Sequence, residues 1–157
     1  MRSRLLRPPR RLLVPLWVLH RLLYRASSGR LGRRLLGAPT LLLTTVGRQS
    51  GRRRQTPLYY LEDGRNLVVV ASNAGSERDP AWLRNLQAAP EAEAWLGPLR
   101  CAVSARLAAP EEVERLWPRL LELYAGYEAY RRSAEREMPV VILEPRQGHR
   151  AAGSGGG

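Results

Sequence analysis

Short β-strand-like runs separated by turn residues fill most of residues 40–143. The predicted strands are the runs at 40–46, 55–61, 66–72, 91–96, 99–107 and 139–143, and residues with high β propensity are most frequent in the first three and the last. Asp63-Gly64 and Gly97-Pro98 separate neighbouring runs, and an Asp-Gly pair is a strong signal for a tight hairpin. Because such short connections favour antiparallel pairing, the sequence predicts a mainly β fold with flanking helices (α+β). We expect a small barrel and not a doubly wound parallel sheet.

Two helical segments interrupt the predicted strands. Asp79 and Pro80 form a favourable N-cap and first-turn pair for a short helix over 81–89. A longer helix is predicted after residue 110, because apolar residues recur there at helical spacing. Pro118 should kink or divide this helix, and a second helical piece should run to about Glu137.

The positive charge of the chain is concentrated in two places. The net charge is +12, and every basic residue among the 26 is an arginine. Residues 1–38 hold ten arginines and no acidic residue, and the stretch 47–54 adds four more. The remainder is close to neutral. Charge placed in this way indicates one or two anionic partners.

The histidine and cysteine counts exclude several kinds of site. The single cysteine, Cys101, cannot form an internal disulfide framework or a multi-cysteine metal site, and its alternating apolar surroundings favour a buried thiol. His20 and His149 lie near opposite ends of the chain, which argues against a catalytic triad or a histidine metal cluster. We also find no Gly-rich dinucleotide or phosphate-binding fingerprint.

Three segments follow from these patterns: a basic N-terminal arm (residues 1–38), a folded body (39–145) and a Gly-rich tail (146–157) that we expect to be disordered. Leucines at helical spacing in the arm predict an amphipathic helix. Its unbroken apolar run from Leu12 to Leu19 is too short to span a bilayer. The helix could lie on an anionic membrane surface or pack across the body, and both interpretations stay open. Nucleic-acid binding is less favoured, because the arm has few aromatic residues for stacking.

Two loops and one helix carry the candidate functional residues. In the stretch TTVGRQSGRRRQTP, the small residues Gly47, Ser50 and Gly51 would let a ligand approach the backbone, and successive amides can cradle a phosphate. The alternative is a solvated turn whose arginines keep a strand edge soluble. The second loop, SNAG, precedes a helix N-terminus that could also face an anion. On that helix, Trp82 and Asn85 share a face and could contact a ring and a polar edge, although Trp82 alone is more typical of a core.

Tyrosines recur every three residues in the segment LYAGYEAYRR. Tyr124, Tyr127 and Tyr130 would form a slanting row on a helix. They could be partly buried with their hydroxyl groups at the surface, or they could form an aromatic wall over a flat ligand.

These stretches carry a resemblance to a known family. TTVGRQSGRRRQTPLYYL, VVASNAGSERDPAWLRNLQAAPE and LWPRLLELYAGYEAYRRSAEREMPVVILEP occur in this order over about residues 40–145. They resemble the deazaflavin-dependent nitroreductases and quinone reductases of actinobacteria. The resemblance implies a split β-barrel of the FMN-binding type that binds the 8-hydroxy-5-deazaflavin coenzyme F-420. The phosphate and oligoglutamate tail of that coenzyme would explain the arginines. FMN is the alternative cofactor.

The resemblance also implies roles for individual residues. Arg48, Gln49 and Ser50 should meet the phosphate and tail, and Trp82 should lie near the ring system. Tyr124, Tyr127 and Tyr130 should border the substrate pocket, and Tyr127, Ser72 and Tyr59 should orient the reaction through hydrogen bonds without a covalent role. The full set expected against the coenzyme is Arg48, Gln49, Ser50, Gly51, Arg54, Gln55, Thr56, Pro57, Leu58, Tyr59, Val70, Ala71, Ser72, Asn73, Ala81, Trp82, Leu83, Arg84, Asn85 and Tyr127.

Two positions depart from the family pattern. Gln49 stands where the family often has Lys or Arg, and Asn73 stands where some members have Lys. Each departure removes one positive charge that could face the coenzyme tail.

The predicted activity is hydride transfer from reduced coenzyme F-420 to a quinone or another flat, electron-poor acceptor such as a nitroaromatic. A non-catalytic carrier of a flavin or deazaflavin is the alternative, and an adaptor acting through the arm is a third interpretation. The expected location is the cytoplasm, with the arm able to hold the protein on the inner face of the cell membrane. The residues do not predict an oligomeric state.

Overall fold

The computed structural model describes Leu19, Leu22 and the segments 34–35, 38–134 and 136–150. Apart from Leu19 and Leu22, the predicted amphipathic helix of the arm lies outside these residues, as does the end of the predicted tail. Within the described part, no helix is long and apolar enough to cross a membrane.

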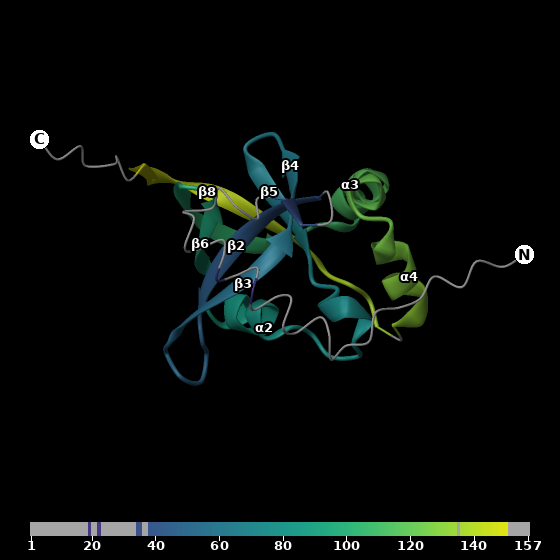
Figure 1. Cartoon of the computed structure of the whole chain (residues 1–157), viewed down its shortest axis with the longest axis horizontal. Coiled ribbons are helices and arrows are strands. Elements are labelled where there is room, and N and C mark those ends of the chain that lie inside the picture. The colour runs from purple at the N-terminus through teal and green to yellow at the C-terminus, as the bar shows by residue number, and fades with distance from the viewer. Residues whose placement is uncertain (1–18, 20–21, 23–33, 36–37, 135, 151–157) are drawn as a thin grey trace, which may run out of the picture.

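The described chain forms one antiparallel sheet with helices packed against it (Figure 1). Its strands are β1 (Arg34–Leu35), β2 (Ala38–Val46), β3 (Arg53–Tyr59), β4 (Leu61–Asp63), β5 (Asn66–Val70), β6 (Glu91–Leu96), β7 (Leu99–Leu107) and β8 (Val140–Arg150). The helical elements are η1 (Asn73–Gly75), α2 (Ala81–Ala88), α3 (Pro110–Leu123) and α4 (Gly126–Ser133).

The sheet closes into a barrel because the strands at its two ends are consecutive in the chain. Hydrogen-bonded neighbours follow the order β3-β2-β6-β7-β8-β5-β4, with β1 added beside β2. The two ends of this path, β3 and β4, are consecutive in sequence and separated only by Tyr60. The predicted barrel of antiparallel strands is confirmed, with the split of a split barrel lying between its two end strands.

Alternation along the strands divides the apolar side chains between two cores. On β8, Val141 and Leu143 enter the core that α2 covers, where they join Leu41 and Leu43 of β2. Val140 and Ile142 enter the second core, which α3 and α4 cover. Because β-strand side chains point to opposite faces in turn, β5 and β8 are apolar on both faces. This explains why their sequences, NLVVV and VVIL, read as continuous apolar runs.

Several element boundaries differ from the sequence prediction. Asp79 does not cap α2, since Pro80 occupies the N-cap position and Asp79 pairs with Arg136 instead. Strand β8 continues to Arg150, so the first residues of the predicted disordered tail are strand. The second helical piece, α4, ends at Ser133 and does not reach Glu137.

Pro118 does not divide the long helix. Helix α3 runs without interruption from Pro110 to Leu123, and the chain breaks only at Tyr124 and Ala125. A proline removes one backbone hydrogen bond, but Leu116 and Leu120 on either side of Pro118 are completely buried. Their packing outweighs the local preference.

An ion-pair cluster fastens the β4–β5 hairpin to α3. Asp63 at the hairpin accepts hydrogen bonds from Arg115 at 2.8 and 2.9 Å and from Arg119 at 3.0 Å. Arg119 also donates to the carbonyl oxygen of Glu62 at 2.8 Å. The hydrogen bonds from Arg115, followed by the one from Arg119, lower the pKa of Asp63 from 3.8 to about 2.

We expect Asp63→Asn to lower the melting temperature at pH 7 by roughly 2–4 °C, because an amide cannot form the charged bonds to both arginines. A lowered folded-state pKa contributes stability above pH 3.8 that disappears as the pH falls toward 2. The difference between wild type and variant should therefore shrink over that interval in melting curves recorded at successive pH values. Glu62→Gln in the same hairpin is the control, and a constant difference down to pH 2 would contradict the assignment.

Candidate functional site

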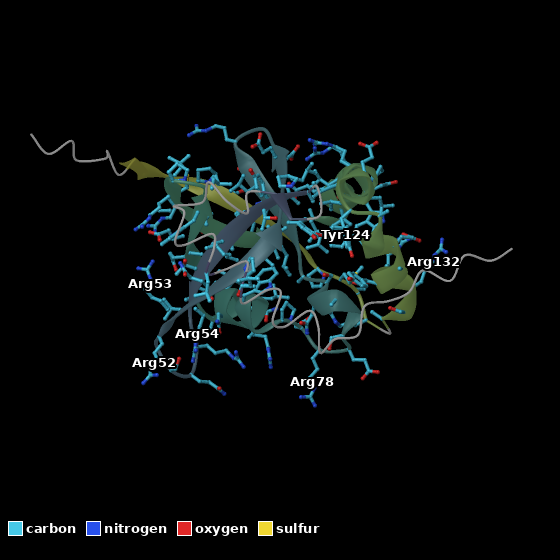
Figure 2. All side chains as sticks on the ribbon, in the orientation of Figure 1. Arg52, Arg53, Arg54, Arg78, Tyr124 and Arg132 are labelled. Carbon is cyan, nitrogen blue, oxygen red and sulfur yellow. The ribbon has the colours of Figure 1, made fainter. Side chains whose placement is uncertain are left out.

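A hydrogen-bonded turn joins β2 to β3, and the segment 47–54 comprises this turn and the first two residues of β3. Its arginines are exposed. The amide of Gly47 donates to the carbonyl of Arg52 at 2.8 Å, and the amide of Gly51 donates to the carbonyl of Gly47 at 2.7 Å. Gly51 has a φ of +66°, which favours glycine. We call this segment the arginine loop, and Figure 2 shows Arg52, Arg53 and Arg54 at its lower-left end.

Only one arginine of this loop pairs with an acidic residue in the described part of the chain. Arg53 contacts Glu93 on β6 at 3.0 Å. Arg48 donates instead to the amide oxygen of Asn85 at 3.3 Å. Arg52 and Arg54 are exposed and form no ion pair with a described residue. The loop therefore keeps an excess of positive charge that an anionic ligand could neutralise.

Asn85 joins the arginine loop to α2 and β2. This buried side chain accepts from the Arg48 amide at 3.2 Å and donates to the hydroxyl of Thr45 at 3.1 Å. Both Asn85 and Thr45 are less than 5% exposed. A buried polar side chain needs hydrogen-bond partners, and Asn85 finds them on β2 and in the loop. Asn85 therefore fixes where the loop begins through these bonds.

A left-handed turn after β5 forms the second part of the site. Ser72 has right-handed angles (φ −72°, ψ −30°), whereas Asn73, Ala74 and Gly75 have φ values of +44°, +52° and +75°. A right-handed residue followed by a left-handed one turns successive amide N–H groups toward a common point, which is a known anion-binding geometry. The amides of residues 72–74 form no hydrogen bond with the described part of the chain. They remain available as donors to a ligand.

Asn73 supports this turn with its side chain. Its amide nitrogen donates to the carbonyl oxygen of Arg78 at 2.8 Å. Asn and Gly tolerate positive φ better than most residues, which explains their place here. A lysine at position 73 would add a positive charge, whereas the Asn73 side chain forms a hydrogen bond within its own loop.

The turn packs directly against α4. A Cβ atom placed on Gly75 would come within 3.2 Å of both Tyr130 and Ser133. Glycine is therefore required by its contacts as well as by its φ value. This contact connects the turn to the tyrosines of α4, and Figure 1 shows α2, the turn and α4 following one another around the lower edge of the barrel.

Four tyrosines form a cluster between β3 and the α3–α4 junction. The ring of Tyr124 lies 5.2 Å from that of Tyr59, 5.1 Å from that of Tyr127 and 6.0 Å from that of Tyr130. The hydroxyl groups of Tyr124 and Tyr130 are 3.1 Å apart. Tyr127 is 4% exposed, whereas Tyr124 and Tyr130 are half-buried. Tyr127 therefore supports the cluster from below, and Tyr124 and Tyr130 provide its accessible surface.

Burial keeps the phenol groups of this cluster protonated. Desolvation is the main cause that raises the pKa values of Tyr59, Tyr124 and Tyr127, and neighbouring tyrosines add to it. At neutral pH these hydroxyl groups are hydrogen-bond donors and not phenolates. They can stabilise negative charge that develops on an acceptor oxygen.

The predicted site residues differ in exposure and fall into three groups. The exposed ones are Arg48, Gln49, Ser50, Gly51, Arg54, Asn73, Ala81 and Arg84, and the half-buried ones are Gln55, Thr56, Leu58, Ser72, Tyr124 and Tyr130. The hydroxyl of Ser50 accepts a hydrogen bond from the Arg52 amide. In contrast, Pro57, Tyr59, Val70, Ala71, Trp82, Leu83, Asn85 and Tyr127 are buried. Trp82 is 5% exposed and belongs to the core under α2, so its ring packs against Leu and Val side chains.

Sequence reasoning missed one residue of this region, Arg136. Its guanidinium group contacts the loop that contains the left-handed turn, although the residue lies 60 positions further along the chain. The segment AEREMP gives no signal for this role, because a single arginine in a polar stretch is typical of a solvated surface.

A cavity of about 950 Å³ lies between α3, α4 and the start of β8, and Arg136 is one of its lining residues. Trp117, Arg131 and Met138 are among its lining residues, and the Arg131 guanidinium lies 5.3 Å from the centre of the Trp117 ring. None of the predicted site residues lines this cavity.

Comparison with known proteins points to one family. Residues 17–145 match the family described as F420H(2)-dependent quinone reductase, where F420H(2) denotes the reduced form of coenzyme F-420. An F420H(2)-dependent quinone reductase of Mycobacterium tuberculosis is 40% identical over 137 residues, which cover 85% of this chain and 92% of that protein.

Solved structures support the same relationship. An F420-H2 dependent reductase, FDR-A, superposes with a TM-score of 0.62 at 34% identity, over 68% of this chain and 94% of the other. A protein solved as a domain-swapped dimer gives a TM-score of 0.65 at 31% identity, over 83% of this chain and 99% of the other.

We expect Asn85→Ala to lower the free energy of unfolding by about 1–3 kcal/mol, because it removes the amide that joins Thr45 to the arginine loop and leaves a buried hydroxyl without its partner. Urea denaturation measures this loss. Gln87→Ala on the exposed side of the same helix is the control, with an expected change within about 0.5 kcal/mol. Equal changes in the two variants would show that Asn85 does not anchor the loop.

Proposed function

The chain belongs to the family of F420H(2)-dependent quinone reductases, and we propose that the surface between the arginine loop and the tyrosine cluster is where it acts. As a member of this family the protein is an oxidoreductase. When bound, reduced coenzyme F-420 supplies the hydride that reduces a quinone. The proposal concerns which residues of this chain hold the coenzyme and which meet the acceptor.

The observation that supports the coenzyme site best is the excess positive charge of the arginine loop. Arg52 and Arg54 have no acidic partner in the described part of the chain, and the amides of residues 72–74 point to a second anion position. Both features flank α2, because Asn85 holds the loop and the turn precedes Pro80. A coenzyme that carries a phosphate and several carboxylates fits two such positions better than a ligand with one charge.

We assign the phosphate and tail to the arginine loop. Arg48, Arg52 and Arg54 would hold the anionic groups, and Gln49, Ser50 and Gly51 would offer polar groups and close backbone approach. The outer edge of β3 from Arg54 to Tyr59 would run along the coenzyme. Ser72 and Asn73 would bind a polar edge of it through their amides. Because Trp82 is buried, its proposed part is to support α2 from the core.

We assign the acceptor to the tyrosine cluster. Tyr124 and Tyr130 are half-buried and carry a pair of neighbouring hydroxyl groups, which could contact a flat ligand. The raised pKa values of Tyr59, Tyr124 and Tyr127 keep these groups as donors toward the oxygen that gains charge. No side chain in this arrangement needs a covalent role, because proximity and fixed dipoles account for the chemistry. A quinone fits this surface, and a nitroaromatic has the same flat, electron-poor character.

Fluorescence titration with coenzyme F-420 tests the arginine assignment. We expect Arg52→Ala and Arg54→Ala each to weaken binding about tenfold, because each removes a charge-assisted contact. The loss should appear mainly in the apparent KM for the coenzyme, with a smaller change in kcat. Affinity should also become less sensitive to salt, since fewer charges are screened.

Arg65→Ala is the matched control, because this exposed arginine lies in the β4–β5 turn at the opposite end of the barrel from the arginine loop (Figure 1). Unchanged affinity in both loop variants would refute the assignment. FMN titrated in parallel tests the alternative cofactor, and preference for FMN would move the protein to flavin chemistry.

We further propose that residues 1–38 bind an anionic membrane surface and hold the enzyme near a membrane quinone. The support is compositional: ten arginines, no acidic residue, and leucines at helical spacing. Co-sedimentation should detect the full chain with anionic vesicles and not with zwitterionic ones, and 0.5 M salt should release it. Equal sedimentation with both vesicle types, or preferential capture by duplex DNA, would contradict this proposal.

A further inference from the structure

The guanidinium group of Arg136 forms several hydrogen bonds around the left-handed turn. Its Nη2 atom donates to the carbonyl oxygens of Ala71 at 3.0 Å and Ser72 at 3.3 Å, and its Nε atom donates to the carbonyl of Ser76 at 2.9 Å. Its Nη1 atom pairs with Asp79 at 3.1 Å. The side chain is only 16% exposed. One guanidinium thus binds the loop before, within and after the turn.

Peptide geometry makes these carbonyl contacts informative about the amides. In a trans peptide unit the C=O and N–H bonds point in opposite directions, and the described part of the chain has no cis peptide bond. The carbonyl of Ala71 shares its peptide unit with the amide of Ser72. The carbonyl of Ser72 shares its unit with the amide of Asn73. When Arg136 holds both carbonyls on one side, both N–H groups must face the other side.

We propose that Arg136 is the positioning residue of the anion-binding turn, and that it aims the amides of Ser72 and Asn73 at the coenzyme. This inference rests on the proposed function for the identity of the ligand, but the hold of Arg136 on the turn can be measured without a ligand. The guanidinium also strengthens these donors, because a cation at the carbonyl end of a peptide polarises its N–H group.

Backbone strain explains why such a residue is needed. Asn73 and Ala74 both have positive φ values, which cost free energy in any residue other than glycine. A turn of this kind persists only where its surroundings over-determine it. The bonds from Arg136, together with the amides of Gly75 and Ser76 bonded within the turn at 2.9 and 3.0 Å, supply that constraint.

The shape of the guanidinium matters more than its charge in this role. Lysine would keep the attraction to Asp79, but an ammonium group cannot reach Ser76, Ala71 and Ser72 from fixed directions at once. Arg136→Lys therefore separates carbonyl positioning from charge. Asp79→Asn performs the reverse separation, since it removes the ion pair and leaves the carbonyl contacts in place.

Hydrogen exchange in the protein without coenzyme gives the first readout. The amides of Gly75 and Ser76 should exchange about tenfold faster in Arg136→Lys than in the wild type, because the turn opens more often. In Asp79→Asn we expect a smaller increase. Arg106→Lys is the control: Arg106 bonds Glu112 and Glu144 through a similar set of contacts that does not involve the turn. Its exchange at Gly75 and Ser76 should match the wild type.

Titration with coenzyme F-420 gives the second readout. Arg136→Lys should raise the dissociation constant about tenfold and the coenzyme KM to a similar extent, with the quinone KM unchanged. Arg106→Lys should bind the coenzyme as the wild type does.

The outcomes separate the two proposals. A wild-type chain that does not bind coenzyme F-420 would overturn the proposed function, whereas wild-type exchange in Arg136→Lys would overturn the hold on the turn whatever the ligand. Faster exchange with unchanged coenzyme affinity would overturn the aiming role. Equal effects in Arg136→Lys and Asp79→Asn would show that the ion pair, and not the carbonyl contacts, sets the turn.

Discussion

Closure of the barrel is the constraint on which the rest of the structure depends. Strands β3 and β4 are consecutive in the chain, yet they lie at the two ends of the hydrogen-bonded path through the sheet. The single residue between them, Tyr60, therefore sets where the barrel closes. This closure leaves β3 paired only with β2 among the described strands and directs Tyr59 at its end toward α3 and α4. The arginine loop at the start of β3 and the tyrosine cluster at its end are thus two ends of one strand.

The polar groups of the candidate site lie in loops at the ends of barrel strands. Each functional stretch follows or precedes a strand whose side chains are buried: the arginine loop follows β2, and the left-handed turn follows β5. A strand buried on both faces cannot carry charged side chains without a large desolvation cost. Charge and free amides therefore accumulate in the loops, and Asn85 and Arg136 connect those loops to the rigid elements behind them.

The sequence was sufficient to predict most strands, and the exceptions have physical causes. The predicted site residues stay a prediction. The hairpin at Gly97 and the strands on either side of it were predicted residue by residue, because turn chemistry is local. Helix α3 was predicted to kink or divide at Pro118, and it does not divide there, because burial of Leu116 and Leu120 is a tertiary effect that the local sequence does not show. Asp79 was read as a helix cap because its actual partner, Arg136, is distant in sequence. The positions of the Trp82 ring and the Asn85 amide were likewise decided by long-range packing.

The protonation state of the tyrosines and the pairing of two acidic groups near the loops belong to the same electrostatic arrangement. A hydride that moves to a quinone leaves negative charge on the acceptor oxygen, so a useful surface offers donors and keeps anions away. The phenols of Tyr59, Tyr124 and Tyr127 meet the first requirement because burial holds them neutral. Asp79, the acidic residue just before α2, is paired with Arg136, and Glu93 near the arginine loop is paired with Arg53. These two ion pairs reduce the negative charge next to the amides of the turn and the unpaired arginines.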